Sequence, residues 1–414
     1  MADRADLLVI GAGVIGVTAA LMAQARGRRV ILIDRSGPAA GASRGNAGGL
    51  AFSEIEPMAA PATLRSAPRW LLDPLGPLSV PPGELPKRAP WLLRFALAAH
   101  PARVRASRQA LAALNLLSRD ELKPFLDATG TRNLLRERGH LSVYDRARHF
   151  AAARKDWEER GRFGMDCRFL DGAEALATVQ PGLHSRFAHG IFTTHWWSID
   201  DPRRYVERLH AAFLARGGLW RVGTVEGLLA GTAGPAAQLA GGETLHAEKI
   251  LVAAGAWSHL LLHDLGLHIP LDTERGYNTT LPGNSIGLRM PITFEAHGFV
   301  TSPIGSGIRV GGAVELGGLE RPPHPKRARA LLDKARAFLP GLDTSGGTEW
   351  MGFRPSLPDS LPVIGPAGPA DVFLAFGHGH LGLTQSAGTG RLICDLIDGQ
   401  TPPVDAAPFR ADRF

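Results

Sequence analysis

Three glycines close to the start of the chain have the spacing of a phosphate-binding turn. Gly11, Gly13 and Gly16 form the pattern Gly-x-Gly-x-x-Gly, and Asp34 follows them. Gly11 allows a tight turn, Gly13 has no Cβ that would hold a pyrophosphate away, and Gly16 lets a helix pack closely on a strand. The helix N-terminus offers free N–H groups and a positive dipole to phosphates. The Asp34 carboxylate can accept hydrogen bonds from ribose hydroxyls but would repel a 2′-phosphate, so a dinucleotide other than NADP is predicted.

The residues around this turn predict the β-α-β unit that such a site requires. Residues 7–10 are an apolar run of the length of a buried strand, and residues 17–26 form an Ala-rich helix. Residues 30–33 are a second apolar strand, which ends at Asp34. Arg35 opens the next turn and is a further candidate for cofactor binding.

A second glycine-rich loop, residues 41–49, follows the β-α-β unit and contains Ser43, Asn46 and Gly48. A flexible linker would have a similar composition. We expect instead that this loop lays backbone N–H groups against the far end of the cofactor, because consecutive N–H groups in such a loop form an anion-binding concavity.

A third glycine-rich turn lies near the C-terminus. Residues 372–376 have the composition of a buried strand, residues 377–384 form a turn with two histidines, and residues 386–397 are expected to be a helix. This arrangement predicts another helix N-terminus that can face a partial negative charge.

The remaining elements alternate between helical and extended patterns, as in a mixed α/β protein. We expect residues 250–254 to return to the parallel sheet near the cofactor, because this apolar run has the length of a buried strand and stops at small residues. The other expected elements are helical segments within 106–160, strands at 141–144 and 190–199, a helix capped by Asp201, a hairpin around 231–242, an antiparallel sheet within 269–314 and a helix at 324–340.

Residues 61–90 are rich in proline, so we expect no long regular element there. This stretch and the residues after it combine apolar and basic side chains. One interpretation is a pair of helices with solvated arginines, and the other is an apolar and basic surface that rests on anionic lipid. The basic residues are Lys87, Arg88, Arg94, Arg103, Arg105 and Arg108.

Length and composition indicate a soluble globular enzyme. The chain has 414 residues, of which 44% are apolar and 21% charged, so we expect two intertwined domains. The formal charge of +7 favours an anionic substrate or an anionic membrane surface. We expect no nucleic-acid partner, because the basic residues are dispersed and no zinc-finger spacing or RNA-binding aromatic pattern accompanies them.

The two cysteines, Cys167 and Cys394, form no disulfide framework, which favours a reducing compartment. The chain opens directly into its first expected strand, so we expect no cleaved signal peptide. No apolar run is long enough to span a membrane. The expected location is the cytoplasm, with peripheral contact to the inner face of the membrane as a second possibility. We expect no metal site, because the histidines lack ligand spacing.

With these motifs in hand, the sequence resembles the D-amino-acid oxidase superfamily of FAD enzymes, and within it the D-amino-acid dehydrogenase branch. The resemblance covers essentially the whole chain, and its C-terminal pair of motifs is specific. The motifs that carry it are the pattern from Gly11 to Asp34, residues 42–48, Trp70-Leu71-Leu72-Asp73-Pro74, Arg275-Gly276-Tyr277, and the runs 352–365 and 377–383.

The resemblance implies an α/β fold of two parts. An FAD-binding, Rossmann-like domain of the glutathione-reductase type would be intertwined with an α+β substrate domain built on an antiparallel sheet. The FAD-binding domain would comprise residues 1–72, 196–268 and 345–414, and the substrate domain residues 73–195 and 269–344.

The resemblance also implies roles for the cofactor-binding residues. Gly11, Gly13 and Gly16 would hold the pyrophosphate of FAD and Asp34 its ribose. Noncovalent binding is expected, because neither cysteine lies in a loop beside the flavin and Arg44 stands where some relatives carry an attaching histidine. Ser43, Asn46 and Gly48 would lie near the flavin ring, Val225 would meet adenine through its backbone, and Gly379, Leu381, Gly382, Leu383 and Thr384 would line the pyrimidine edge.

The implied reaction is oxidation of a D-amino acid by hydride transfer from Cα to flavin N5, which gives an imino acid. Arg354 would clamp the substrate carboxylate, because a planar guanidinium makes two parallel hydrogen bonds to it. Tyr277 is a second candidate for contact with the carboxylate or the amine. His380 could hold a carboxylate or a substituent, or set the protonation of the amine. The expected substrate is D-proline or cis-4-hydroxy-D-proline, otherwise a D-alanine-like amino acid.

Other functions stay open. The same fold could serve a glycine- or sarcosine-type amine oxidase, or a flavin subunit of a heteromeric amino-acid dehydrogenase complex. The electron acceptor could accordingly be a quinone, a partner subunit or oxygen. An NAD dehydrogenase is disfavoured, because such enzymes rarely combine the second glycine-rich loop with the C-terminal glycine turn.

Overall fold

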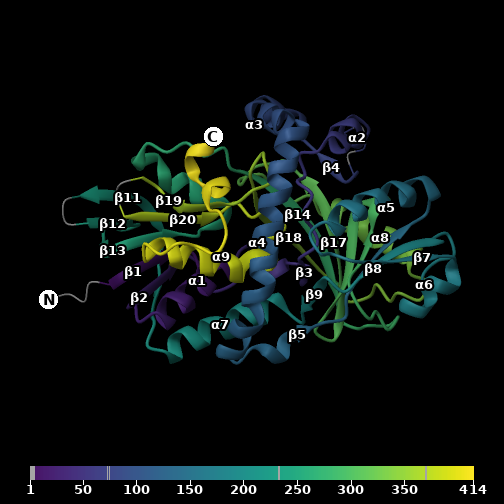
Figure 1. Ribbon diagram of the computed structural model, residues 1–414, viewed down its shortest axis with the longest axis horizontal. Coiled ribbons are helices and arrows are strands. Elements are labelled where there is room, and N and C mark those ends of the chain that lie inside the picture. The colour runs from purple at the N-terminus through teal and green to yellow at the C-terminus, as the bar shows by residue number, and fades with distance from the viewer. Residues whose placement is uncertain (1–4, 72, 74, 232–233, 369–370) are drawn as a thin grey trace.

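The computed structural model describes residues 5–71, 73, 75–231, 234–368 and 371–414. Two large sheets lie side by side, and the long helix α4 (Pro101–Ala128) runs between them (Figure 1). A small three-stranded sheet lies in the same region, where the two large sheets meet. Its strands are β3 (Gly49–Ala51), β9 (Trp196–Ile199) and β5 (Leu135–Arg136).

The first large sheet has eight strands, five of which form a parallel core in the order β10-β2-β1-β13-β20. Strands β11 and β12 join β13 as an antiparallel meander, and β19 pairs antiparallel with β20. Residues 232–233 of the expected hairpin lie outside the described residues. The bounds are β1 (Ala5–Ile10), β2 (Val30–Asp34), β10 (Leu219–Val222), β11 (Val225–Gly231), β12 (Gly234–Leu239), β13 (Thr244–Val252), β19 (Val363–Pro366) and β20 (Val372–Phe376).

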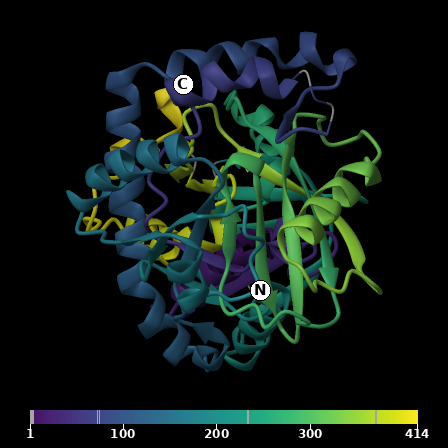
Figure 2. The same ribbon diagram turned by 90° about the vertical axis from the view of Figure 1, so that its right-hand side faces the viewer.

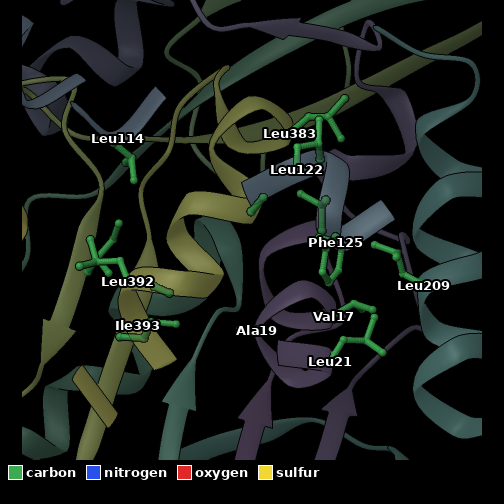
Figure 3. Close-up of a cluster of buried hydrophobic side chains, with 14 of the residues drawn as sticks. Val17, Ala19, Leu21, Leu114, Leu122, Phe125, Leu209, Leu383, Leu392 and Ile393 are labelled. Carbon is green, nitrogen blue, oxygen red and sulfur yellow. The ribbon is translucent and has the colours of Figure 1, made fainter. Parts of the chain in front are cut away.

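Helices cover this parallel core, as its nearly continuous apolar strands require. Helices α1 (Val14–Ala25), α7 (Pro202–Ala215) and α9 (Gly382–Ile397) pack with α4, and their apolar side chains interlock as in Figure 3. Val17 and Leu21 of α1 and Ile393 of α9 are at most 1% exposed. Helix α7 begins where expected, because the Asp201 carboxylate accepts hydrogen bonds from the N–H groups of residues 203 and 204.

The second large sheet has nine strands and is mostly antiparallel, in the order β18-β14-β17-β16-β15-β6-β8-β7, with β4 beside β17. Helix α8 (Pro325–Phe338) packs on one face, and α5 (Ala147–Gly161) and α6 (Ala173–Val179) lie near β7 and β8 (Figure 1). The bounds are β4 (Leu78–Ser79), β6 (His140–Tyr144), β7 (Arg168–Asp171), β8 (His189–Thr193), β14 (Asp272–Leu281), β15 (Ile292–Phe294), β16 (Phe299–Ile304), β17 (Gly307–Glu315) and β18 (Thr348–Ser356).

Short 3-10 turns connect many of these elements. They are η1 (Ala42–Gly45), η2 (Pro82–Glu84), η3 (Arg132–Leu134), η4 (Gly255–Leu265), η5 (Glu295–His297), η6 (Ala407–Phe409) and η7 (Ala411–Arg413).

Two expectations about local structure were wrong. The strand expected over 190–199 is two strands in different sheets, β8 and β9, because the chain breaks at residues 194–195 and passes from one sheet to the next. The proline-rich stretch, in which we expected no long regular element, forms two helices, α2 (Pro61–Leu71) and α3 (Leu85–Ala98), and so agrees with the interpretation of a helix pair. Pro61 and Pro86 lie in the first turns, where a helix does not use the backbone N–H, although each helix also contains an internal proline. Leu72 and Pro74 of the matching motif lie outside the described residues.

The division into two domains stays a prediction. Of the segments assigned to the cofactor domain, 345–414 also supplies β18, which pairs with β14 in the nine-stranded sheet. Leu72, the expected end of the first segment, is not among the described residues.

Candidate active site

A cavity of about 2010 Å³ extends between the two large sheets. It reaches from the first glycine turn to the nine-stranded sheet, and it exceeds the roughly 300–1,000 Å³ of a usual ligand pocket, so it can hold a dinucleotide together with a substrate. Gly16 and Gly48 are not among its lining residues. The predicted residues that line it are Gly11, Gly13, Asp34, Arg35, Ser43, Asn46, Val225, Tyr277, Arg354, Gly379, His380, Leu381, Gly382, Leu383 and Thr384.

In the first glycine turn, close packing leaves no room for a side chain at Gly11 or Gly16. Gly11 has a φ of +110°, and a Cβ there would lie 2.4 Å from the Ala253 carbonyl oxygen. A Cβ on Gly16 would lie 1.9 Å from the Gly11 carbonyl oxygen, so Gly16 packs behind the turn. A Cβ on Gly13 would meet nothing nearer than Ser43 Oγ at 3.4 Å, so Gly13 faces open space in the cavity.

Asp34 helps to hold this turn. Its Oδ2 accepts a hydrogen bond from Ala12 N at 2.9 Å, and its Oδ1 accepts from Ser36 N and Gly37 N. An ionised carboxylate offers about four acceptor positions, so room for a further donor remains. Arg35 beside it lies over the ring of Trp257, with 3.9 Å from the guanidinium carbon to the ring centroid, which is a cation–π contact.

The second glycine-rich loop joins the two sheets. Asn46 Oδ1 accepts from Gly48 N at 2.8 Å, and Asn278 of β14 donates to the Gly45 carbonyl at 2.9 Å. Ser43 Oγ accepts from Val14 N at the start of α1 at 3.0 Å. The loop is therefore fastened at one end to α1 and at the other to the nine-stranded sheet.

The C-terminal glycine turn brings the start of α9 to the cavity. The first N–H groups of a helix lack partners within the helix, so this end is open to an electronegative group. Thr384 differs from its neighbours, because its Oγ1 accepts from Ala51 N at 2.9 Å in a buried contact. Its hydroxyl thereby connects α9 to β3.

Arg354 lies on β18 and presents its guanidinium to the cavity over β14. Gly276 on β14 leaves the space, because a Cβ there would lie 2.4 Å from Arg354 Nη2. The register sets Arg354 opposite Glu274, and Gly352 opposite Gly276. Opposite residues in an antiparallel pair share a face of the sheet, so Arg354 lies over Gly276, while the Trp350 ring fills the space over Gly352.

The surroundings of Arg354 leave most of its donors available. Among the described residues, its guanidinium donates one hydrogen bond, from Nη1 to the Ala313 carbonyl at 3.0 Å. Burial lowers the pKa of Arg354, while the nearby charge of Glu274 opposes that shift, and arginine remains charged at neutral pH. Burial raises the pKa of Glu274, which accepts a hydrogen bond from Ser356 Oγ at 2.6 Å.

The structure does not bring the Tyr277 hydroxyl to Arg354. The hydroxyl donates to the Glu315 carboxylate and accepts from His324 N at 3.2 Å, and neither partner lines the cavity. Side chains alternate along a strand, so if Gly276 faces the cavity, Tyr277 points to the face covered by α8. Burial and the bond to Glu315 raise the pKa of Tyr277. Tyr277 thus lines the cavity while its hydroxyl is bonded away from Arg354, and its contact with substrate stays a prediction.

His380 and Arg354 lie close together. His380 lines the cavity, where its side chain is exposed to solvent although dense protein surrounds it. Burial, together with the positive charge of Arg354, lowers the pKa of His380 to about 4. The imidazole is therefore neutral at pH 7 and can donate one hydrogen bond and accept one.

One corner of the cavity is lined by polar and charged side chains that the sequence analysis did not identify. Glu54 follows β3, and burial together with the nearby charge of Glu295 raises its pKa to about 7. Arg160 of α5 lies 3.9 Å from Glu54 through Nη2, and Glu295 accepts from Ser142 Oγ at 2.7 Å. These residues come from distant segments, so only the fold unites them. Glu54 lies shortly after the second glycine-rich loop, which is the one hint that the sequence offers.

Two further observations bound the chemistry. No group of three or more metal-ligating side chains is found among the residues that the structure describes. In the same part of the chain, no helix is both long and apolar enough to cross a membrane.

Comparison with known proteins identifies the class. The family model DAO, described as FAD dependent oxidoreductase, matches residues 6–396, and the chain belongs to this family. A D-amino-acid oxidase of Bradyrhizobium diazoefficiens is 35% identical over the full length of both chains. A D-amino acid dehydrogenase of Rhizorhabdus wittichii is 32% identical, covering 99% of this chain and 100% of the relative. The glycine oxidase of Geobacillus kaustophilus shares the fold, with a TM-score of 0.80 at 20% identity over 99% of both chains.

The chain is therefore an FAD-dependent oxidoreductase, and its cavity fits the cofactor. The glycine turn leaves backbone-lined space at Gly13, two helix N-termini border the cavity, and the volume exceeds that of one small ligand. FAD binds without a covalent bond, and no cysteine is among the described residues that line the cavity. Cys394 is buried within α9, where its thiol donates to the Ala19 carbonyl.

Proposed function

We propose that this protein oxidises the Cα–N bond of a D-amino acid. The observation that carries the proposal is the arrangement of Arg354. Its guanidinium lies over Gly276 and lines the cavity with one described hydrogen-bond acceptor, so its remaining donors suit a carboxylate. The names of the relatives, a D-amino-acid oxidase and a D-amino acid dehydrogenase, support the choice of the D configuration.

The residues at the first turn have proposed cofactor roles. Backbone N–H groups at the start of α1 and the space at Gly13 would hold the pyrophosphate, Asp34 the ribose and Val225 the adenine. Bound FAD supplies the acceptor for the two electrons and the hydrogen that leave the substrate Cα. The chain's own contribution is position, because oxidation needs one orientation of Cα and little acid–base help once the amine is neutral. Residues proposed near the flavin are Ser43, Asn46, Gly48, Gly379, Leu381, Gly382, Leu383 and Thr384.

At the substrate end, we assign Arg354 to the carboxylate and His380 to a neighbouring polar group. A neutral imidazole beside the clamp can accept from the substrate amine or donate to a ring hydroxyl. The substrate nitrogen loses a proton as Cα loses its hydrogen and two electrons, and the product is an imino acid that water can hydrolyse. Tyr277 has no assigned contact with substrate, because its hydroxyl is already bonded to Glu315 and His324.

Our proposed substrate is D-proline or cis-4-hydroxy-D-proline, with a D-alanine-like amino acid next. A secondary amine in a ring has few rotatable bonds, so one carboxylate clamp fixes most of its orientation. The acceptor that reoxidises the flavin would be a quinone, a partner subunit or oxygen.

The experiment is an anaerobic titration of the purified flavoprotein, followed by the visible flavin band. D-proline, cis-4-hydroxy-D-proline, D-alanine, glycine, sarcosine and L-proline are added in turn. Bleaching by a D-amino acid is expected. Bleaching by glycine or sarcosine alone would point to an amine oxidase, and no bleaching by any of them would point to a flavin subunit of a larger complex. Admitting air, or a quinone, to the bleached sample then identifies the acceptor.

We further propose a cytoplasmic location and the two-domain division given above. Both cysteines are free thiols, Cys167 half-buried and Cys394 buried, as suits a reducing compartment. Limited proteolysis of the holoprotein would test the division, because cuts between compact domains fall in exposed linkers.

A further inference from the structure

Helices α2 and α3 form a cover over one end of the cavity. We define the cover as residues 61–98, without residues 72 and 74. It crosses one end of the molecule in dark blue (Figure 2). Its inner side lines the cavity through Trp70, Trp91 and Phe95. Strand β4 anchors it to β17, and Arg88 anchors it to Asp272 at 3.1 Å.

The outer side of the cover is unusually apolar. Leu93 is 62% exposed and Leu97 54%, and their spacing of four residues sets them on one stripe of α3. The solvent-facing stripe of a surface helix is normally polar. Five of the eleven exposed large apolar side chains of the described chain are in this short segment, namely Leu71, Leu75, Leu85, Leu93 and Leu97.

The cover and the first turn of α4 together carry most of the net charge of the protein. Residues 61–105 contain seven basic and two acidic residues, a formal charge of +5 out of +7 for the chain. Arg88 and Glu84 bond to each other at 3.2 Å, so the exposed set is strongly basic. Arg65 and Arg69 line the cavity, so the exposed basic residues outside the cavity lining are Lys87, Arg94, Arg103 and Arg105.

We propose that this outer face docks on the surface of an anionic lipid bilayer. The exposed leucines would enter the boundary between headgroups and acyl chains, while the basic side chains meet lipid phosphates. No membrane-crossing helix is required for such contact. The proposal does not rest on the identity of the substrate.

Charge favours lipid over a second copy of the chain. A two-fold interface sets the same patch on both subunits, so it would bring two basic surfaces together. An anionic bilayer instead neutralises that charge. Leu93 and Leu97 of α3 are exposed, whereas the opposite side of this helix buries Trp91 and Ala98.

The test is cosedimentation of the holoprotein with vesicles of phosphatidylcholine, with and without about one third phosphatidylglycerol. Binding is expected to the anionic vesicles and to weaken as salt is added, because surface charges are screened. The variant Leu93→Glu/Leu97→Glu should bind at least about tenfold more weakly, as should Arg94→Gln/Arg103→Gln/Arg105→Gln. Flavin content and circular dichroism check that each variant is folded.

A matched control distinguishes binding through this face from nonspecific binding of vesicles by any exposed apolar side chains. Leu219 and Val222 on β10 are 53% and 68% exposed at the edge of the other sheet. Leu219→Glu/Val222→Glu should bind vesicles as the wild type does. The proposal is overturned if the wild type ignores anionic vesicles, if it binds neutral vesicles equally well, or if the α3 variant binds unchanged. If light scattering shows the wild type to be a dimer and the Leu93→Glu/Leu97→Glu variant to be a monomer, the face is instead an interface with a second copy of the chain.

Discussion

The two ends of the cavity differ in what forms them, because backbone atoms shape the dinucleotide end and single side chains shape the substrate end. At the dinucleotide end, consecutive residues around Gly11 and Gly13 shape a backbone surface, and the tolerance at each position is set by the space for a Cβ. At the substrate end, single side chains on β14, β18 and the turn before α9 meet above glycines. Arg354 and Gly276 are distant in sequence and adjacent only through strand register.

This difference separates steric from electrostatic control. The dinucleotide end should fail when bulk is added, whatever the charge of the new side chain. The substrate end should fail when the guanidinium is moved or removed, while the cofactor stays bound. The two ends can therefore be broken one at a time.

Gly13→Val should have the largest effect, because its side chain would occupy open space that faces the cavity at the glycine turn. We expect folded protein without flavin absorbance, measured by the ratio of visible to ultraviolet absorption. Gly161→Ala is the control, since a Cβ there meets nothing within 4 Å. Retention of flavin by Gly13→Val would remove the pyrophosphate assignment.

Gly276→Ala should disturb only the substrate end. Its Cβ would lie 2.4 Å from Arg354 Nη2 and displace the guanidinium. A loss of about 1.4 kcal/mol in carboxylate binding would raise KM about tenfold with little change in flavin content. Gly283→Ala, in open space after β14, serves as control. An unchanged KM for Gly276→Ala would mean that this guanidinium position is not used.

Tyr277→Phe should leave KM within about a factor of two, because the hydroxyl faces Glu315 rather than the clamp. It should lower the free energy of unfolding by about 1–3 kcal/mol, since a buried carboxylate loses a donor. Urea unfolding measures the second effect. A large rise in KM with normal stability would return Tyr277 to the substrate site.

Glu54→Gln should have the smallest effect, on the pH dependence of stability. The folded pKa of Glu54 is raised to about 7 from its ordinary value of 4.5. Between these values the folded state holds more protons than the unfolded chain, so the free energy of unfolding falls as pH rises. The side chain is 33% exposed, which reduces the contribution to about 1 kcal/mol. The melting temperatures at pH 5 and pH 8 should therefore differ less in Glu54→Gln than in the wild type. An equal difference in the two proteins would argue against the raised pKa of Glu54.

The dinucleotide end was predictable because its signal is local. The turn, both flanking strands and Asp34 lie within one stretch, and each residue type has a steric or electrostatic reason. The additional task of Asp34, which accepts from Ala12 N, is a consequence of the same turn.

The substrate end was predictable only in part. A motif can nominate Arg354, but neither the opposing Gly276 nor the side on which Tyr277 lies follows without the register of β14 and β18. The alternation along 274–278 could have separated Gly276 from Tyr277, yet it does not tell which face meets the cavity. Glu54 and Arg160 meet through tertiary packing alone. A pair of helices at α2 and α3 was one of two interpretations, but their length within the proline-rich stretch was underestimated because proline counts were weighed without regard to first-turn positions.

The most direct test of the whole account is anaerobic titration of Arg354→Ala with the D-amino acid that bleaches the wild type fastest. Removing a charged, doubly hydrogen-bonded partner should cost about 3 kcal/mol, so the half-maximal rate of flavin bleaching should need roughly a hundredfold more substrate. The oxidised flavin spectrum before titration should match that of the wild type. A half-maximal bleaching rate at the wild-type substrate concentration, or loss of flavin from the variant, would contradict the division of the cavity into a backbone-held cofactor end and an arginine-held substrate end.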